Sequence, residues 1–77
     1  MKAKDLKIGE FIESDGIRKE RVSNNAYRMQ WGKRVPKGYI ALCAPVVNNQ
    51  WKLDWWLLKE DAEVYFIGNV NDIARNN

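Results

Sequence analysis

Turn-forming residues divide this chain into short segments, and their spacing constrains the fold more than any other feature of the sequence. An Asp-Gly pair stands at 15–16, Asn doublets stand at 24–25 and 48–49, and glycines bracket residues 32–38. Asp-Gly suits a type I′ hairpin because both central residues need a positive φ, and asparagine tolerates the same left-handed backbone. Short apolar stretches between such turns are typical of β-strands. The spacing therefore predicts a β-rich fold.

Several of these segments carry a strand pattern. Residues 6–12 read as a loop that enters a strand, and residues 17–22 return as a strongly charged strand, which we expect at an edge or on a wet face. Residues 27–31 alternate strictly between apolar and polar, which indicates a half-buried strand. Residues 39–44 are apolar on both faces and are interpreted as the central strand. The last strand is predicted over 63–67.

Residues 51–58 fit two structures. As a strand, the segment turns one row of side chains inward: Trp51, Leu53, Trp55 and Leu57. As a helix, it gathers residues at i, i+4, i+7 and i+11: Trp51, Trp55, Leu58 and Ala62. We favour the strand, because residues 48–49 make a good hairpin turn and tryptophan is common in strands. Residues 59–62 would then form a short 3₁₀ or α turn.

The size and composition allow one domain without catalytic chemistry. Seventy-seven residues suffice for a single modest core, predicted over 1–68 with 69–77 as a polar, flexible tail. The chain has no histidine and one cysteine, so it lacks the usual general base, the usual zinc ligand and any internal disulfide. Cys43 stands in an apolar segment without a neighbouring cation to activate it. We therefore expect no enzyme activity, no metal and no cofactor.

The sequence also favours a cytoplasmic location. It contains no run of 18 apolar residues, and no apolar signal segment follows its first five residues. A free cysteine fits a reducing compartment. These features predict a protein of the cytoplasm without a membrane partner, either in its own cell or in the host cell of a virus.

Positive charge gathers in the first half of the chain. Residues 1–38 carry ten Lys/Arg and five Asp/Glu, a net charge of +5, whereas residues 39–77 carry three and five, a net charge of −2. Cations next to aromatic rings are how proteins hold single-stranded nucleic acid, with phosphates on the cations and bases stacked on the rings. The alternative is that these charged side chains form an ordinary solvated surface without a ligand. The candidate nucleic-acid-binding residues are Arg28, Trp31, Lys33, Arg34, Lys37 and Tyr39.

A cluster of tryptophans at 51, 55 and 56 supports a second hypothesis. With Trp55 inward, Trp56 faces outward next to Leu58, and exposed tryptophan is enriched at binding hot spots. Trp56 and Leu58 are therefore candidate protein-interface residues, for a host protein or for a second copy of the chain. In this reading the protein binds and modulates a host protein or complex.

Two segments resemble small barrels of the Src-homology-3 type. Residues 6–12, Leu-Lys-Ile-Gly-Glu-Phe-Ile, resemble the Leu-x-x-Gly-Asp/Glu-x-Ile/Val first strand of such barrels, including the KOW and Tudor groups. Residues 56–64 look like their strand, 3₁₀ turn and closing strand. The resemblance implies an all-β, five-stranded small barrel with one 3₁₀ or short helical turn before the last strand. KOW-type members imply RNA partners, and Tudor-type members imply an aromatic cage for a methylated cation. The chain also resembles small phage-encoded proteins.

Overall fold

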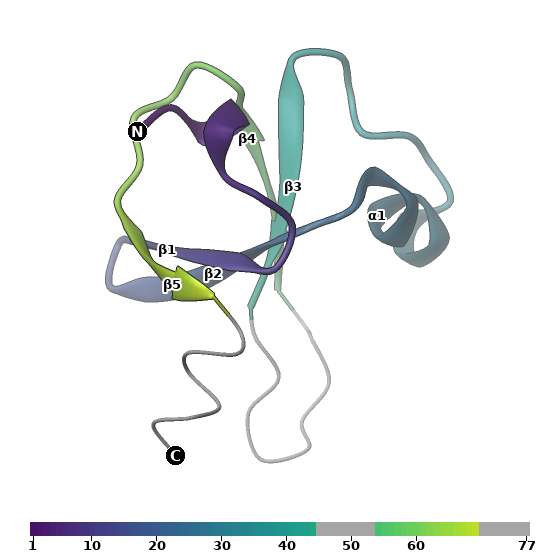
Figure 1. Cartoon of the computed structure of the whole chain (residues 1–77). Coiled ribbons are helices and arrows are strands. Elements are labelled where there is room, and N and C mark those ends of the chain that lie inside the picture. Colours follow the sequence, from purple (N-terminus) through teal and green to yellow (C-terminus); the bar gives the residue numbers. More distant parts are fainter. Residues whose placement is uncertain (45–53, 70–77) are drawn as a thin grey trace.

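The described part of the chain forms one open sheet of five antiparallel strands, with one helix beside it (Figure 1). The computed structural model describes residues 1–44 and 54–69. Along the sheet the strand order is β4-β3-β2-β1-β5. The strands are β1 (Glu10–Ser14), β2 (Ile17–Val22), β3 (Tyr39–Cys43), β4 (Trp55–Lys59) and β5 (Phe66–Asn69). The remaining elements are the 3₁₀ helix η1 (Ala3–Asp5) and the helix α1 (Asn24–Trp31). The predicted β-rich fold is thus confirmed.

The predicted hairpin at Asp15-Gly16 is also confirmed. These two residues connect β1 to β2, and the pairing closes with Ser14 opposite Ile17. Asp15 has a φ of 56° and Gly16 has a φ of 74°. A two-residue turn with both central φ angles positive matches the right-handed twist of the strands that flank it.

Helix α1 replaces the strand predicted over 27–31, and that prediction is wrong. The helix begins after Ser23, whose Oγ accepts a hydrogen bond from the backbone N–H of Ala26 at 3.0 Å. It ends at Gly32, which has a left-handed φ of 70° and donates its N–H to the carbonyl of Arg28 at 2.7 Å. Such caps satisfy backbone groups that the helix itself leaves unpaired. Two capping residues therefore outweigh the apolar/polar alternation between them.

The charged strand β2 lies in the middle of the sheet, so the expectation of an edge position is wrong. Its charged side chains find partners in distant segments. Lys19 is only 7% exposed, and its Nζ lies 4.5 Å from the centroid of the Trp56 ring. The Arg21 guanidinium donates to the backbone carbonyls of Leu6 and Lys4. Strand β3, predicted as the central strand, is an interior strand next to β2, with both of its faces buried.

The second half of the chain follows the strand prediction with shifted boundaries. Strand β4 confirms the extended structure for the described part of 51–58, while Trp51 and the turn at 48–49 lie outside the described residues. Ala62 donates its N–H to the carbonyl of Lys59 at 3.1 Å, which closes a turn at the predicted place. This turn is not a 3₁₀ helix, and the 3₁₀ helix of the described chain is η1. The last strand, predicted over 63–67, is observed as β5.

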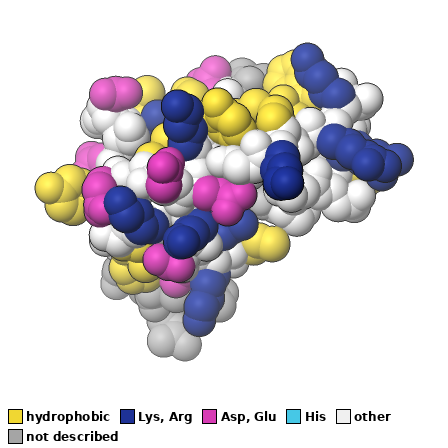
Figure 2. Space-filling model, turned by 90° about the horizontal axis from the view of Figure 1, so that it is seen from above, with side chains coloured by type: hydrophobic (Ala, Val, Ile, Leu, Met, Phe, Trp, Pro, Cys, Tyr) yellow, Lys and Arg dark blue, Asp and Glu magenta, His cyan; other side chains and the backbone are white. Residues whose placement is uncertain are grey.

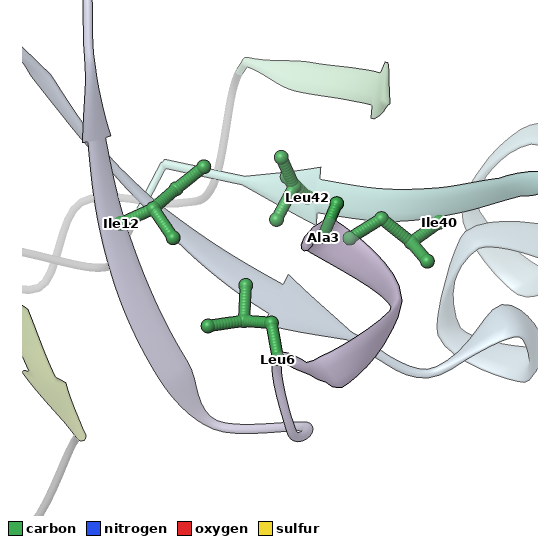
Figure 3. Close-up of a cluster of buried hydrophobic side chains, with 5 residues drawn as sticks. All are labelled: Ala3, Leu6, Ile12, Ile40 and Leu42. Atoms are coloured by element: carbon green, nitrogen blue, oxygen red, sulfur yellow. The ribbon is translucent and has the colours of Figure 1, made fainter. Parts of the chain in front are cut away.

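Hydrophobic side chains pack on both faces of the sheet. The first cluster lies on one face and consists of Ala3, Leu6, Ile12, Ile40 and Leu42, which point toward one another (Figure 3). The second cluster lies on the face next to α1 and consists of Val22, Tyr27, Ala41 and Cys43. Trp56 and Leu58 pack against the first cluster, whereas Trp55 packs against the second. A single inward row through Trp55 and Leu57 is therefore wrong, because both faces of β4 are packed.

The N-terminal segment runs beside the connection between β4 and β5 (Figure 1). Backbone hydrogen bonds join Ala3 to Ala62 and Lys4 to Glu60, each at 2.8 Å. Lys2 Nζ lies 2.8 Å from Glu63 Oε1, and this hydrogen bond and the charge of Lys2 hold the pKa of the Glu63 carboxyl below its ordinary value. These contacts fix the N-terminal segment to the connection between the two edge strands.

Candidate nucleic-acid interface

An open groove of about 350 Å³ lies between α1 and β4. We call it the aromatic groove; it is lined by Tyr27, Trp31, Lys33, Trp55, Trp56 and Leu57. The Trp55 ring meets Tyr27 at a centroid distance of 6.3 Å and an angle of 64°, and it meets Trp31 at 6.3 Å and 87°. Edge-to-face contacts of this kind are favourable for aromatic rings. They hold Trp31 against the molecule while 47% of its surface stays exposed.

The sequence builds this groove from two periodicities. Tyr27 and Trp31 are four residues apart, so they lie on the same side of α1. Trp55 and Leu57 are two residues apart on β4, so they share the face of the sheet that α1 covers. Opposite them on β3 stand the small side chains of Ala41 and Cys43. The aromatic rings therefore gather at the border between helix and sheet.

A second open groove, of about 310 Å³, runs along another side of α1. We call it the arginine groove; it is lined by Asn24, Asn25, Arg28, Arg34 and Val35. Val35 also packs against the second cluster, which anchors the loop between α1 and β3. The Asn25 side-chain amide donates to the sulfur of Met29 at 3.6 Å. Lys33 and Arg34 are consecutive in this loop, yet each lines a different groove.

The helix and its following loop form a purely basic stretch of surface. Residues 24–38 contain no aspartate or glutamate, and all four of their cations are exposed: Arg28, Lys33, Arg34 and Lys37. Figure 2 shows blue side chains without magenta ones toward the right, where α1 lies in Figure 1, and mixed charge toward the left. Negative ligands are therefore attracted to the helix side of the molecule.

Of the six predicted nucleic-acid-binding residues, the structure brings four to the two grooves. Trp31 and Lys33 line the aromatic groove, and Arg28 and Arg34 line the arginine groove. Lys37 is exposed in the loop and Tyr39 is half-buried at the start of β3, and neither lines either of these two grooves.

The prediction missed the residues that complete the two grooves. They are Asn24, Asn25, Tyr27, Val35, Trp55 and Leu57. The i, i+4 spacing of Tyr27 and Trp31 was the available signal, and it becomes readable only once α1 is recognised as a helix.

The predicted protein-interface residues occupy a different environment. Trp56 and Leu58 are half-buried and pack against the first cluster. Trp56 also lines the aromatic groove, and Lys19 lies over its ring. Much of the apolar surface of Trp56 is therefore used inside the molecule.

Other kinds of site are not evident in the part of the chain that the structure describes. Within residues 1–44 and 54–69, no three acidic, cysteine or histidine side chains gather where a metal ion could be held. None of the helices in these ranges has the length and apolar character needed to cross a bilayer. No protein-family model, curated protein or solved structure matches this chain. The two grooves are thus the features from which function can be argued.

Proposed function

We propose that this protein binds single-stranded nucleic acid through α1 and the loop that follows it. The observation that carries the proposal is the aromatic groove, in which the half-exposed ring of Trp31 stands beside the cation of Lys33. Proteins hold single strands by stacking bases on such rings and by pairing phosphates with nearby cations. The purely basic surface of residues 24–38 supplies further cations around the groove.

The chemistry of the aromatic groove favours a nucleotide over a methylated cation as its ligand. A methylated cation, as in the cages of Tudor domains, would meet the like charge of Lys33 at the rim. A nucleotide offers a flat ring for Trp31 and a negative charge for Lys33. Duplexes keep their base faces stacked inside, so a single strand or an unpaired loop is the better ligand.

The test is to remove the loop cations and measure binding of a labelled single-stranded oligonucleotide by fluorescence anisotropy. The variant Lys33→Gln/Arg34→Gln/Lys37→Gln should lose most of the binding at low salt, with an unchanged unfolding temperature. The matched control is Lys4→Gln/Lys7→Gln/Arg18→Gln, which removes three exposed cations outside residues 24–38. This control should bind nearly as the unmodified protein does. No binding by the unmodified protein at low salt would refute the proposal.

A protein partner or a second copy, docking on Trp56 and Leu58, is the competing proposal. It predicts an affinity that changes little with ionic strength, whereas phosphate contacts make the affinity fall steeply.

We also propose a small barrel of the Src-homology-3 type for the fold. Its support is the N-terminal segment, which is hydrogen-bonded to residues 60–64 between the two edge strands.

A further inference from the structure

The two grooves lie on neighbouring sides of one helix. Successive residues of an α-helix are about 100° apart, so Tyr27 and Trp31 face one side, while Arg28 and Asn25 face the next. The peptide that joins Lys33 to Arg34 connects the two grooves beyond the end of the helix. A cation therefore stands in each groove at adjacent positions of the chain, Lys33 in one and Arg34 in the other.

The arginine groove differs chemically from the aromatic groove. It contains no aromatic ring, and two guanidinium groups and two side-chain amides line it. A guanidinium is a planar fork of donors that matches the geometry of a phosphate, and it is always charged. No carboxylate lines this groove among the residues that the structure describes, so its arginines compete with no anion from the groove wall. Its chemistry suits a phosphate rather than a base.

We propose that the two grooves hold consecutive units of one strand, an inference that rests on the proposed function. One base stacks in the aromatic groove on Trp31, and the phosphate that connects it to the next nucleotide lies between Arg28 and Arg34. The smallest ligand that reaches both grooves is then a single nucleotide, with its base in the aromatic groove and its phosphate in the arginine groove. Because every base has a face to stack, the site tolerates many sequences.

Salt dependence separates the two grooves experimentally. The probe is a labelled thymidine octanucleotide, titrated by anisotropy over a series of salt concentrations. Each phosphate contact contributes about −0.7 to the slope of log affinity against log salt for single strands. The variant Arg28→Gln/Arg34→Gln should weaken binding and make this slope shallower by about 0.7 or more. The variant Trp31→Leu should weaken binding by about 5- to 150-fold with the slope unchanged, because stacking releases no counterions.

Two further measurements keep the inference falsifiable. Arg28→Lys/Arg34→Lys preserves the charge but removes the planar forks, so it should retain the slope and still lose affinity. Unlabelled thymidine monophosphate should compete for the site at least tenfold better than thymidine, because only the nucleotide carries a phosphate for the arginine groove.

The outcomes distinguish the two proposals. If the unmodified protein binds no oligonucleotide, the proposed function itself fails. If the octanucleotide binds but Arg28→Gln/Arg34→Gln has the same slope as Lys4→Gln/Lys7→Gln, the proposed function stands and the second groove holds no phosphate. Equal competition by thymidine monophosphate and thymidine would also overturn the two-groove site.

Discussion

The two faces of the sheet differ in how completely they are covered. On one face, all members of the first cluster are at most 2% exposed: Ala3, Leu6, Ile12, Ile40 and Leu42. On the other face, α1 covers the second cluster but leaves Trp31 and Leu57 partly open to solvent. Strand β3 serves both faces, with Ile40 and Leu42 on the first and Ala41 and Cys43 on the second.

Together with the proposed function, this difference predicts that stability and binding depend on different residues. Large aliphatic side chains fill the first face, where shape complementarity accounts for much of the stability. On the second face lie the small side chains of Ala41 and Cys43, and at its border with the helix Trp31 stays exposed and Trp55 half-buried. Substitutions on the first face should therefore act mainly on folding, and those at the border of the second should also act on ligand binding.

The largest effect is expected from Leu42→Ala. This side chain is 1% exposed, and truncating such a residue costs about 2–5 kcal/mol. A domain of this size has a total stability of about 4–11 kcal/mol, so the variant should lose a large part of it. Urea denaturation followed by circular dichroism measures the change. Met29→Ala, on a side chain that is 79% exposed, is the control and should change stability by less than about 0.5 kcal/mol.

A smaller and more diagnostic effect is expected from the two neighbouring tryptophans of β4. Trp56→Ala should cost about 2–4 kcal/mol, because its ring packs against the first cluster and beneath Lys19. Trp55→Ala should cost a similar amount, because its ring packs against the second cluster and meets Tyr27 and Trp31 edge to face, and it should also weaken oligonucleotide binding at least tenfold. Denaturation and anisotropy on the same two proteins measure both effects. Oligonucleotide binding that Trp55→Ala leaves unchanged would contradict the division between the two faces.

The sequence predicted correctly those elements whose conformation depends mainly on their own residues. The Asp15-Gly16 hairpin and the apolar strand β3 follow directly from turn chemistry and from hydropathy. Helix α1 was missed because Tyr27, Met29 and Trp31 alternate with polar residues, which fits a strand as well as one side of a helix. The decisive signals were the caps at Ser23 and Gly32, which stand outside the alternating segment.

The position of β2 could not be read from its own residues. Four consecutive charged side chains at 18–21 argue for an edge, and only tertiary partners reverse that argument. These partners come from Trp56 on β4 and from the backbone around η1, far along the chain from β2. The aromatic groove could be predicted only in part for the same reason. Trp31 was a candidate from the sequence, but its contact with Trp55 arises only when the chain folds.

The smallest effect is expected from Lys19→Met, which tests why a buried lysine is tolerated on the first face. Methionine keeps an apolar stem of similar length and removes the ammonium that lies 4.5 Å from the Trp56 ring centroid. A cation over a tryptophan face contributes about 0.5–2 kcal/mol, more when both groups are shielded from water. Burial of the ammonium opposes this gain, because a charge loses hydration when it leaves water.

We expect the attraction to Trp56 to exceed the lost hydration, so Lys19→Met should destabilise the protein by about 1 kcal/mol. A double-mutant cycle with Trp56→Leu isolates the pair, because only the hydration cost of the ammonium remains once the ring is absent, and Lys19→Met should then no longer destabilise the protein. Lys19→Arg keeps a cation above the ring and should stay within about 0.5 kcal/mol of the unmodified protein. A stabilising Lys19→Met would mean instead that the hydration cost dominates and that the ring merely covers the lysine stem.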